Sequence, residues 1–151
     1  MKKIVLASDH AACGLKNQLK NYVISKGYEV VDLGPADDSV SVSYAHQGHK
    51  MANYINEHKN DVDFGLAFCG TGLGISYALN RHHDIRAARV TSVQDAELAK
   101  LHNDANVLVM GGRQVSFEEA KAMLDKYMAT SFEGGRHLQR IEDIEKLDLE
   151  N

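Results

Sequence analysis

The chain has 151 residues, and its 17 Lys and Arg residues against 21 Asp and Glu residues give a formal net charge of -4. This length suits one compact domain, which we expect to span residues 1–151, and such a domain needs no disulfide or structural metal to hold its core. The near balance of charge argues against nucleic acid and against membrane surfaces as partners.

Short apolar runs alternate along the chain with stretches of helical periodicity. This alternation is typical of βαβ units built around a parallel sheet. It predicts strands over residues 3–8, 29–33, 63–68, 86–90 and 107–110. We therefore expect five repeats of a strand followed by a helix.

The first predicted helices follow the first two strands. Leu15, Leu19 and Val23 mark one face of the first of these helices, and Gly27 is expected to end it. A second helix is predicted over residues 44–57. Both helices would turn their apolar faces to the sheet.

Capping residues mark the later helices. Ser92 is expected to cap a helix that runs to about His102, and Ser116 with Glu119 predicts a capping box at the start of the next helix. A short charged helix over residues 136–147 has no strand after it, so we expect it to pack on another surface, such as a second subunit. The order predicts a three-layer α/β/α Rossmann-like sandwich with a five-stranded parallel sheet and an extra C-terminal helix.

The run Cys69-Gly70-Thr71-Gly72-Leu73-Gly74 follows the third predicted strand. Open parallel sheets bind ligands beyond the carboxyl ends of their strands, and three alternating glycines at the start of a helix expose backbone N–H groups there. We interpret this run as an anion-binding turn. It matches neither G-x-G-x-x-G nor the Walker pattern, which argues against dinucleotides and nucleoside triphosphates, and we expect no cofactor.

The two cysteines differ in their surroundings. A thiol at a helix N-terminus has its anion favoured by the helix dipole, so Cys69 is a candidate nucleophile or general base. The alternative for any single cysteine is a small buried apolar residue, and this is our interpretation of Cys13. We expect both thiols to be reduced. Together with a polar N-terminal region and no apolar run of roughly 18 residues, this predicts a cytoplasmic protein.

Asp9 and His10 follow the first predicted strand, and we expect both side chains to point into the same crevice as Cys69. Arg136 and Arg140 lie four residues apart on the last predicted helix, after two glycines. Two guanidinium groups on one helical face suit a phosphate, although an exposed charged helix would look similar.

The histidines offer weaker signals. The pairs His46/His49 and His82/His83 lack a Cys or acidic cluster beside them, so we expect exposed polar positions and no metal site. His102 lies where a helix turns back toward the fifth strand, at the sheet edge opposite the crevice. If His102 and Cys69 serve one site, that site must lie between two subunits.

Several motifs in order resemble the family of ribose-5-phosphate isomerase B and the galactose-6-phosphate isomerase subunits. The matching residues are Ser8-Asp9-His10, residues 27–34, residues 69–76, residues 85–88, residues 102–107, Gly112-Arg113, and Glu133-Gly134-Gly135-Arg136-His137 with Arg140. The resemblance spans nearly the whole chain. It implies a Rossmann-like sandwich that forms a homodimer, often within a tetramer, and a metal-free aldose–ketose isomerisation of a sugar phosphate.

The resemblance also implies roles for single residues. Cys69 would move a proton between C1 and C2 through a cis-enediolate, and His102 would assist opening of the furanose ring. Asp9 would contact substrate hydroxyls. The oxyanion would be stabilised by Thr71, the amides from Gly70 through Gly72 to Gly74, and Asn103, and the phosphate would be held by His10, Arg113, Arg136 and Arg140.

One departure from the family pattern concerns the substrate. The family usually has Asp-Tyr-Pro before the second helix, where this chain has Ser43-Tyr44-Ala45. Ribose 5-phosphate and ribulose 5-phosphate are our first expectation. A hexose 6-phosphate of the galactose or allose type and a tetrose phosphate remain open, as does a non-catalytic module that only binds a sugar phosphate.

Overall fold

The structure is a computed structural model that describes residues 2–148. Residues 1 and 149–151, the ends of the expected domain over 1–151, lie outside the described residues. Within that range, five parallel strands form one sheet in the order β2-β1-β3-β5-β4. The strands are β1 (Lys3–Ser8), β2 (Val30–Asp32), β3 (Val62–Cys69), β4 (Ala87–Arg89) and β5 (Val107–Gly111).

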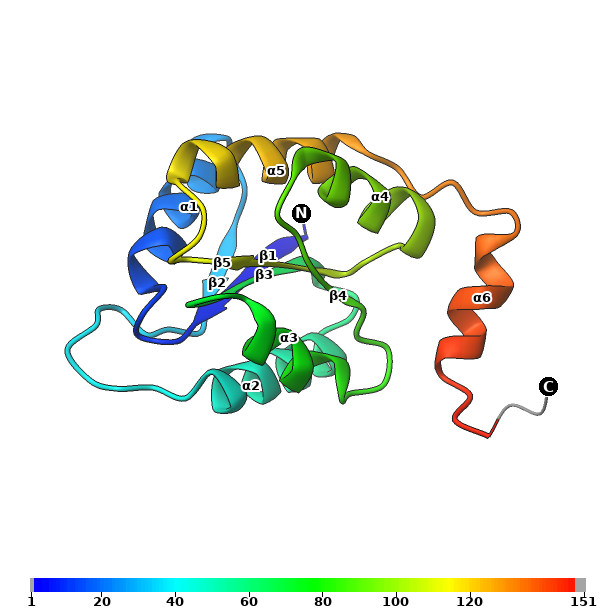
Figure 1. Ribbon diagram of the computed structural model, residues 1–151, viewed down its shortest axis with the longest axis horizontal. Coiled ribbons are helices and arrows are strands. Elements are labelled where there is room, and N and C mark those ends of the chain that lie inside the picture. Colours follow the sequence, from blue (N-terminus) through cyan, green and yellow to red (C-terminus); the bar gives the residue numbers. More distant parts are fainter. Residues whose placement is uncertain (1, 149–151) are drawn as a thin grey trace.

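Helices cover both faces of the sheet. They are α1 (Cys13–Ser25), α2 (Tyr44–Glu57), α3 (Leu73–Asn80), α4 (Val93–Asn103), α5 (Phe117–Ala129) and α6 (His137–Ile144). Helices α1, α4 and α5 lie on one face, α2 and α3 lie on the other, and α6 stands off to one side (Figure 1). The three-layer sandwich with an extra C-terminal helix is therefore confirmed. Across residues 2–148, no helix has the length and apolar character to cross a membrane.

The strands have apolar side chains on both faces because both faces are covered. In β1, Ile4 and Leu6 pack toward α1, α4 and α5. Val5 and Ala7, which alternate with them, pack toward α2 and α3. The same alternation in β3 places Cys69 on the α2/α3 side, so these two helices and their preceding loops surround the thiol.

The predicted boundaries are close to the observed ones. The first strand agrees in full, and the other strands differ by a single residue at the ends that differ. The two strands shorter than predicted, β2 and β4, are the outer strands of the sheet and have a neighbour on one side only. The C-terminal helix, predicted over 136–147, spans His137–Ile144. The carboxylate of the next residue, Glu145, accepts hydrogen bonds from His83 and from the Asp84 N–H.

The predicted helix signals are confirmed. The Ser92 hydroxyl accepts a hydrogen bond from the Asp95 N–H at the start of α4. Ser116 and Glu119 form the capping box of α5. Gly27 has a φ of +93° just after α1, a backbone conformation that favours glycine and ends the helix. Cys13 is buried in α1, as expected for a packing residue.

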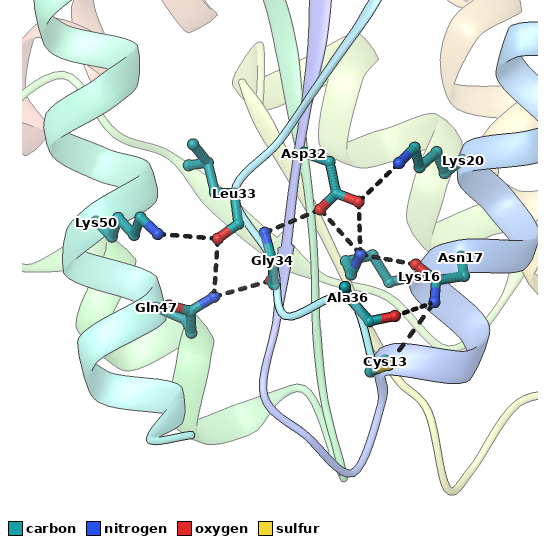
Figure 2. Close-up of polar contacts among 10 residues, drawn as sticks. All are labelled: Cys13, Lys16, Asn17, Lys20, Asp32, Leu33, Gly34, Ala36, Gln47 and Lys50. Atoms are coloured by element: carbon teal, nitrogen blue, oxygen red, sulfur yellow. Dashed lines mark hydrogen bonds and ion pairs between the residues drawn. The ribbon is translucent and has the colours of Figure 1, made fainter. Parts of the chain in front are cut away.

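A polar cluster joins β2 to the helices on either side of it (Figure 2). The Asp32 carboxylate accepts hydrogen bonds from Lys16 at 2.9 Å, from Lys20 at 3.0 Å and from the Gly34 N–H at 2.9 Å. Gln47 of α2 donates to the Gly34 carbonyl at 2.8 Å. Lys16 has 0% exposed side chain and Asp32 has 18%, so this is a buried ion pair. The cluster fixes the start of the loop that leads to α2.

Burial by itself would raise the pKa of the Asp32 carboxyl, but hydrogen bonds from Lys16, the Gly34 N–H and Lys20 outweigh burial and lower that pKa. Replacing Lys16 with Met should reduce the free energy of unfolding by about 2–4 kcal/mol, because a buried carboxylate loses its nearest partner. Urea unfolding measures this difference. Lys20→Met is the matched control and should cost at most about 1 kcal/mol, because Lys20 is one-third exposed.

The difference in the free energy of unfolding between Lys16→Met and the unchanged protein should depend on pH. A carboxyl whose pKa is lowered on folding stabilises the fold above its unfolded pKa, about 3.9, and loses this effect as pH falls through the folded value. The difference should therefore be constant near neutral pH and shrink in acid. An equal cost for the Lys16 and Lys20 variants at all pH values would contradict the buried pair.

Candidate active site

The carboxyl ends of β1, β3 and β5 converge on one cavity of about 330 Å³. Its lining consists of Asp9, Tyr44, Cys69, Gly70, Thr71, Gly74, Tyr77 and Arg113. Six of these eight residues, all but the two tyrosines, are residues that the sequence predicts for the site. A volume of this size is at the small end of the range typical for small-molecule sites.

The Cys69 thiol is the candidate reactive group among the residues that line this cavity. Cys69 ends β3 and is 3% exposed. The Gly72 N–H donates a hydrogen bond to its Sγ atom at 3.2 Å. The sulfur thus lies next to the N-terminus of α3, which begins at Leu73, and both the N–H and the helix dipole favour a negative charge there.

A side chain would be crowded at two glycines of the turn. Gly72 has a φ of +80°, and a Cβ atom there would lie 3.1 Å from the Met110 carbonyl carbon. A Cβ atom at Gly74 would overlap the ring of Tyr44. The turn therefore passes against β5 on one side and an aromatic ring on the other, which explains why glycines alternate in it.

The turn offers further donors to a ligand. The Thr71 hydroxyl accepts a hydrogen bond from the Leu73 N–H at 3.2 Å, so its own proton can point into the cavity. Among residues 2–148, the N–H groups of Gly70 and Thr71 have no hydrogen-bond acceptor. Unpaired N–H groups at the edge of a cavity are suited to an anion or a developing oxyanion.

Of the two candidate residues after β1, Asp9 lines the cavity and His10 does not. The Asp9 carboxylate lines the cavity and accepts a hydrogen bond from the Ala12 N–H at 3.0 Å, which orients it at the start of α1. His10 does not line the cavity. Its Nδ1 atom accepts a hydrogen bond from the Val42 N–H at 3.1 Å, so His10 holds the loop that precedes α2.

Tyr44 and Tyr77 are the lining residues that sequence reasoning missed. Tyr44 opens α2, and the preceding Ser43 caps this helix by accepting hydrogen bonds from the N–H groups of Ala45 and His46. Ser43 thus performs a capping role that an Asp can perform equally well. Tyr77 lies three residues after Gly74 on α3, and this helical spacing was the signal that could have revealed it.

His102, Asn103, Arg136 and Arg140 lie away from this cavity and form no part of its lining. Cys69 is paired with Gly111 at the end of β5, whereas His102 precedes the start of β5 at Val107. Four residues along a strand span about 13 Å. The structure therefore divides the predicted site residues into two groups at opposite ends of the sheet.

The second group centres on two stacked imidazoles. The rings of His102 and His137 have centroids 4.6 Å apart and planes 17° apart. The Glu133 carboxylate lies 3.7 Å from Nε2 of His102 and 3.5 Å from Nε2 of His137. Burial, and next to it the charge of Arg136, lowers the pKa of His137. In the described part of the chain, Arg136 and Arg140 have no carboxylate within 4.0 Å, which leaves both guanidinium groups open to an anion.

His102, Glu133 and His137 bring three potential ligand atoms within 4.8 Å of one another, which raises the question of a metal ion. An imidazole nitrogen binds a metal along its lone pair, in the plane of the ring. Two rings stacked at 17° have lone pairs that run side by side and do not converge on one point. This arrangement therefore suits a shared anion or carboxylate better than a metal ion.

Of the four histidines expected at exposed positions, His46, His49 and His83 are exposed and His82 is not. His49 Nδ1 lies 2.7 Å from His82 Nε2, and His82 is half-buried. Burial and then the charge of His49 lower the pKa of His82. His83 pairs with Glu145 at 2.8 Å. The expectation of exposed polar positions is thus wrong for His82, because α2 and the segment after α3 pack side by side.

Comparison with known proteins gives consistent matches. A family model described as ribose/galactose isomerase matches residues 4–144. Ribose-5-phosphate isomerase B of Escherichia coli is 38% identical over 148 residues, covering 98% of this chain and 97% of that protein. A crystal structure of a ribose 5-phosphate isomerase from Thermotoga maritima has a TM-score of 0.92 and 44% identity, covering 97% of this chain and 99% of that chain. A ribose-5-phosphate isomerase B from Mycoplasma genitalium, solved with bound ribulose-5-phosphate, has a TM-score of 0.90 and 35% identity, covering 95% and 94% of the two chains.

The crowding at Gly72 predicts the cost of a side chain there. Gly72→Ala should lower the free energy of unfolding by about 2–4 kcal/mol, because it adds contact with β5 to an unfavourable backbone conformation. Gly27→Ala is the matched control, since Gly27 also has a positive φ but open space around its Cα, and should cost about 1–2 kcal/mol. Urea unfolding of both variants measures the difference. Equal costs would mean that the turn does not press against β5.

Proposed function

This chain belongs to the ribose/galactose isomerase family. We propose that its cavity binds a sugar phosphate and interconverts the aldose and ketose forms. The first expected pair of substrates is ribose 5-phosphate and ribulose 5-phosphate. The observation that carries the proposal is the Cys69 sulfur, which lies 3.2 Å from the Gly72 amide nitrogen beside a turn with unpaired N–H groups. The family match covers residues 4–144, which include every residue of this cavity.

Proton transfer between two adjacent carbons requires a base that can take and return one proton. In the proposal, the Cys69 thiolate takes the proton from C2 of the open-chain aldose and returns a proton to C1. The electron pair left at C2 forms the double bond of a cis-enediolate, and the negative charge moves to the O1 oxygen. The O2 proton then passes to O1, so that C2 becomes the carbonyl carbon of the ketose when C1 is protonated. No electrons leave the sugar, so the step needs no cofactor.

The charge on the enediolate oxygen needs donors in place before it develops. The amides from Gly70 through Gly72 to Gly74 and the Thr71 hydroxyl supply them from the chain's own turn, although the Gly72 N–H is directed at the Cys69 sulfur. Asp9 is positioned to contact sugar hydroxyls. Asn103 is assigned a supporting role at the oxyanion, which requires a second copy of the chain, because Asn103 lies outside this cavity.

The phosphate is assigned to His10, Arg113, Arg136 and Arg140. Arg113 lines the cavity, and Arg136 and Arg140 are exposed cations without a carboxylate partner among residues 2–148. A phosphate held away from the reacting carbons contributes binding energy that positions C1 and C2 at the thiol. His102 is assigned the opening of the furanose ring, which needs a group that can donate and accept a proton.

Two observations support an active site shared between two copies of the chain. Cys69 and His102 lie at opposite ends of the sheet, so one copy cannot bring both to one sugar. Helix α6 stands apart from the three layers (Figure 1) and exposes Leu138 and Ile144 by about half. We therefore propose a homodimer, alone or within a tetramer, in which His102, Asn103, Arg136 and Arg140 of one copy complete the cavity of the other.

Hexose 6-phosphates of the galactose or allose type and tetrose phosphates remain alternative substrates. The departure at residues 43–45 does not by itself favour them, because Ser43 caps α2 and Tyr44 lines the cavity. The proposal places the enzyme in the cytoplasm, as one domain, with both thiols free.

The assignment of Cys69 predicts the behaviour of a simple exchange experiment. In heavy water, the unchanged protein should place deuterium on C1 or C2 of an aldose phosphate, and Cys69→Ala should reduce this exchange by about a hundredfold to ten-thousandfold. Nuclear magnetic resonance of the sugar measures the exchange. Cys13→Ala is the matched control and should exchange at the rate of the unchanged protein, because Cys13 is buried in α1.

The same experiment separates the alternatives when four-, five- and six-carbon phosphates are compared. Preferred exchange with a hexose phosphate would overturn ribose 5-phosphate as the substrate. Binding of these sugars without any exchange in the unchanged protein would indicate a non-catalytic module. Full exchange in Cys69→Ala would remove Cys69 as the base.

The shared site predicts complementation between two inactive variants. Cys69→Ala and His102→Ala should each be inactive alone, whereas dimers that contain one chain of each kind have one site with both residues present. Random mixing by co-expression should restore about one quarter of the activity, since half the dimers are mixed and each has one intact site of two. Activity per dimer, with mixed dimers quantified by native mass spectrometry, checks this. Mixed dimers without activity would place both residues in a single chain's site.

A further inference from the structure

Arg89 reaches the active-site turn from the edge of the sheet. It is the last residue of β4, and its Nε donates a hydrogen bond to the Thr71 carbonyl at 3.1 Å. Its Nη2 donates to the side-chain oxygen of Gln114 at 2.7 Å. Its Cγ atom lies under Gly72, where an added Cβ would approach it to 3.2 Å. Arg89 is therefore held by two hydrogen bonds and packs against the turn, and it is not among the residues that line the cavity.

The Thr71–Gly72 peptide links Arg89 to the thiol. The carbonyl of this peptide accepts the hydrogen bond from Arg89, and its N–H donates to Cys69 Sγ at 3.2 Å. In a trans peptide the C=O and N–H groups point in opposite directions, so one planar unit joins the guanidinium to the sulfur. A charged donor on the carbonyl polarises the peptide and strengthens its N–H as a donor.

The charge of Arg89 is permanent, and Arg89 forms no direct ion pair within residues 2–148. A guanidinium stays protonated throughout the pH range of proteins. Asp95 of α4 shares the groove along β4 with Arg89 but accepts hydrogen bonds from Thr91, and within residues 2–148 no carboxylate lies within 4.0 Å of Arg89. The titratable groups that line the cavity with the thiol are Asp9, Tyr44, Tyr77 and Arg113. Arg89 is not among these lining residues and reaches the turn from β4.

We propose that Arg89 is a positioning residue that holds the Thr71–Gly72 peptide with its N–H against the Cys69 sulfur and thereby favours the thiolate. The inference that Arg89 favours the Cys69 thiolate is argued from geometry alone. The inference that Arg89 thereby assists catalysis rests on the proposed role of Cys69 as the base. The proposal also gives a reason for the length of the Arg89 side chain, which must cross the end of β5 to reach the turn.

The test measures the reactivity of the thiol directly. In a Cys13→Ala background, where Cys69 is the only thiol, the rate of alkylation by iodoacetamide is measured across a series of pH values. Arg89→Met keeps the stem under Gly72 and removes the charge and the donors. This variant should slow alkylation near neutral pH by about threefold to tenfold and move the midpoint of the pH profile upward.

Arg86→Met is the matched control. Arg86 immediately precedes β4 and also donates through Nε to backbone carbonyls, those of Asn103 and Asp104, at the other end of the strand. Its loss should disturb the edge of the sheet to a similar degree and leave the alkylation profile of Cys69 unchanged. Arg89→Lys, which keeps the charge, should recover part of the rate. Circular dichroism confirms that each variant is folded, and Arg89→Gln replaces Arg89→Met if the latter is not.

The outcomes separate the two levels of the proposal. An alkylation profile in Arg89→Met that equals that of Arg86→Met would overturn the role of Arg89, whatever Cys69 does in catalysis. A shifted profile supports it, even if Cys69→Ala were to retain full exchange. Where Cys69 is the base, Arg89→Met should also lower kcat by about tenfold while KM changes by less than about twofold, because Arg89 does not touch the sugar.

Discussion

The hydrogen bond from the Gly72 N–H to the Cys69 sulfur is the interaction on which the site depends. It exists because the chain reverses between the end of β3 and the start of α3, which brings the Gly72 N–H back to the Cys69 sulfur. Gly72 then enters α3 with a φ of +80°, and a side chain there would crowd β5, so this course of the turn favours glycine. The Cys69 thiol, the Thr71 hydroxyl and the unpaired amides all take their positions from this course.

The two-residue period of the strands decides what surrounds the thiol. Cys69 falls on the α2/α3 face of β3, together with Ala67. On this face, Tyr44 comes from the start of α2 and lies against Gly74 at the start of α3. A shift of β3 by one residue would turn the sulfur toward α1 and α5, away from both tyrosines. The register of the central strand therefore determines the surroundings of the Cys69 thiol as well as the packing of the core.

Much of the site could be predicted from the sequence because the relevant signals are local. Strand ends gather at one edge of a parallel sheet, so Asp9, Cys69 and Arg113 could be grouped by counting strands alone. Tyr44 and Arg89 could not be found in this way. Their contacts depend on which elements are neighbours in space: Tyr44 needs α2 beside α3, and Arg89 needs β4 beside β5. The periodicity of apolar residues predicts each element but not the order β2-β1-β3-β5-β4. The contact between His49 and the half-buried His82 escaped prediction for the same reason.

The geometry of a βαβ unit also explains why a single copy holds two separate halves of the predicted site. A helix that returns to begin the next strand must end at the amino edge of the sheet, and α4 ends there with His102 and Asn103. Residues at that edge cannot approach a cavity at the carboxyl edge without breaking the strand between them. The following segment carries Arg136 and Arg140 away from the layers on α6, whose apolar residues Leu138 and Ile144 are about half exposed in the isolated chain. If a second copy packed on α6 of the first, the cations and imidazoles of the first copy would lie at the cavity of the second. The same contact that buries the helix would then complete the chemistry, so assembly and activity are expected to be lost together.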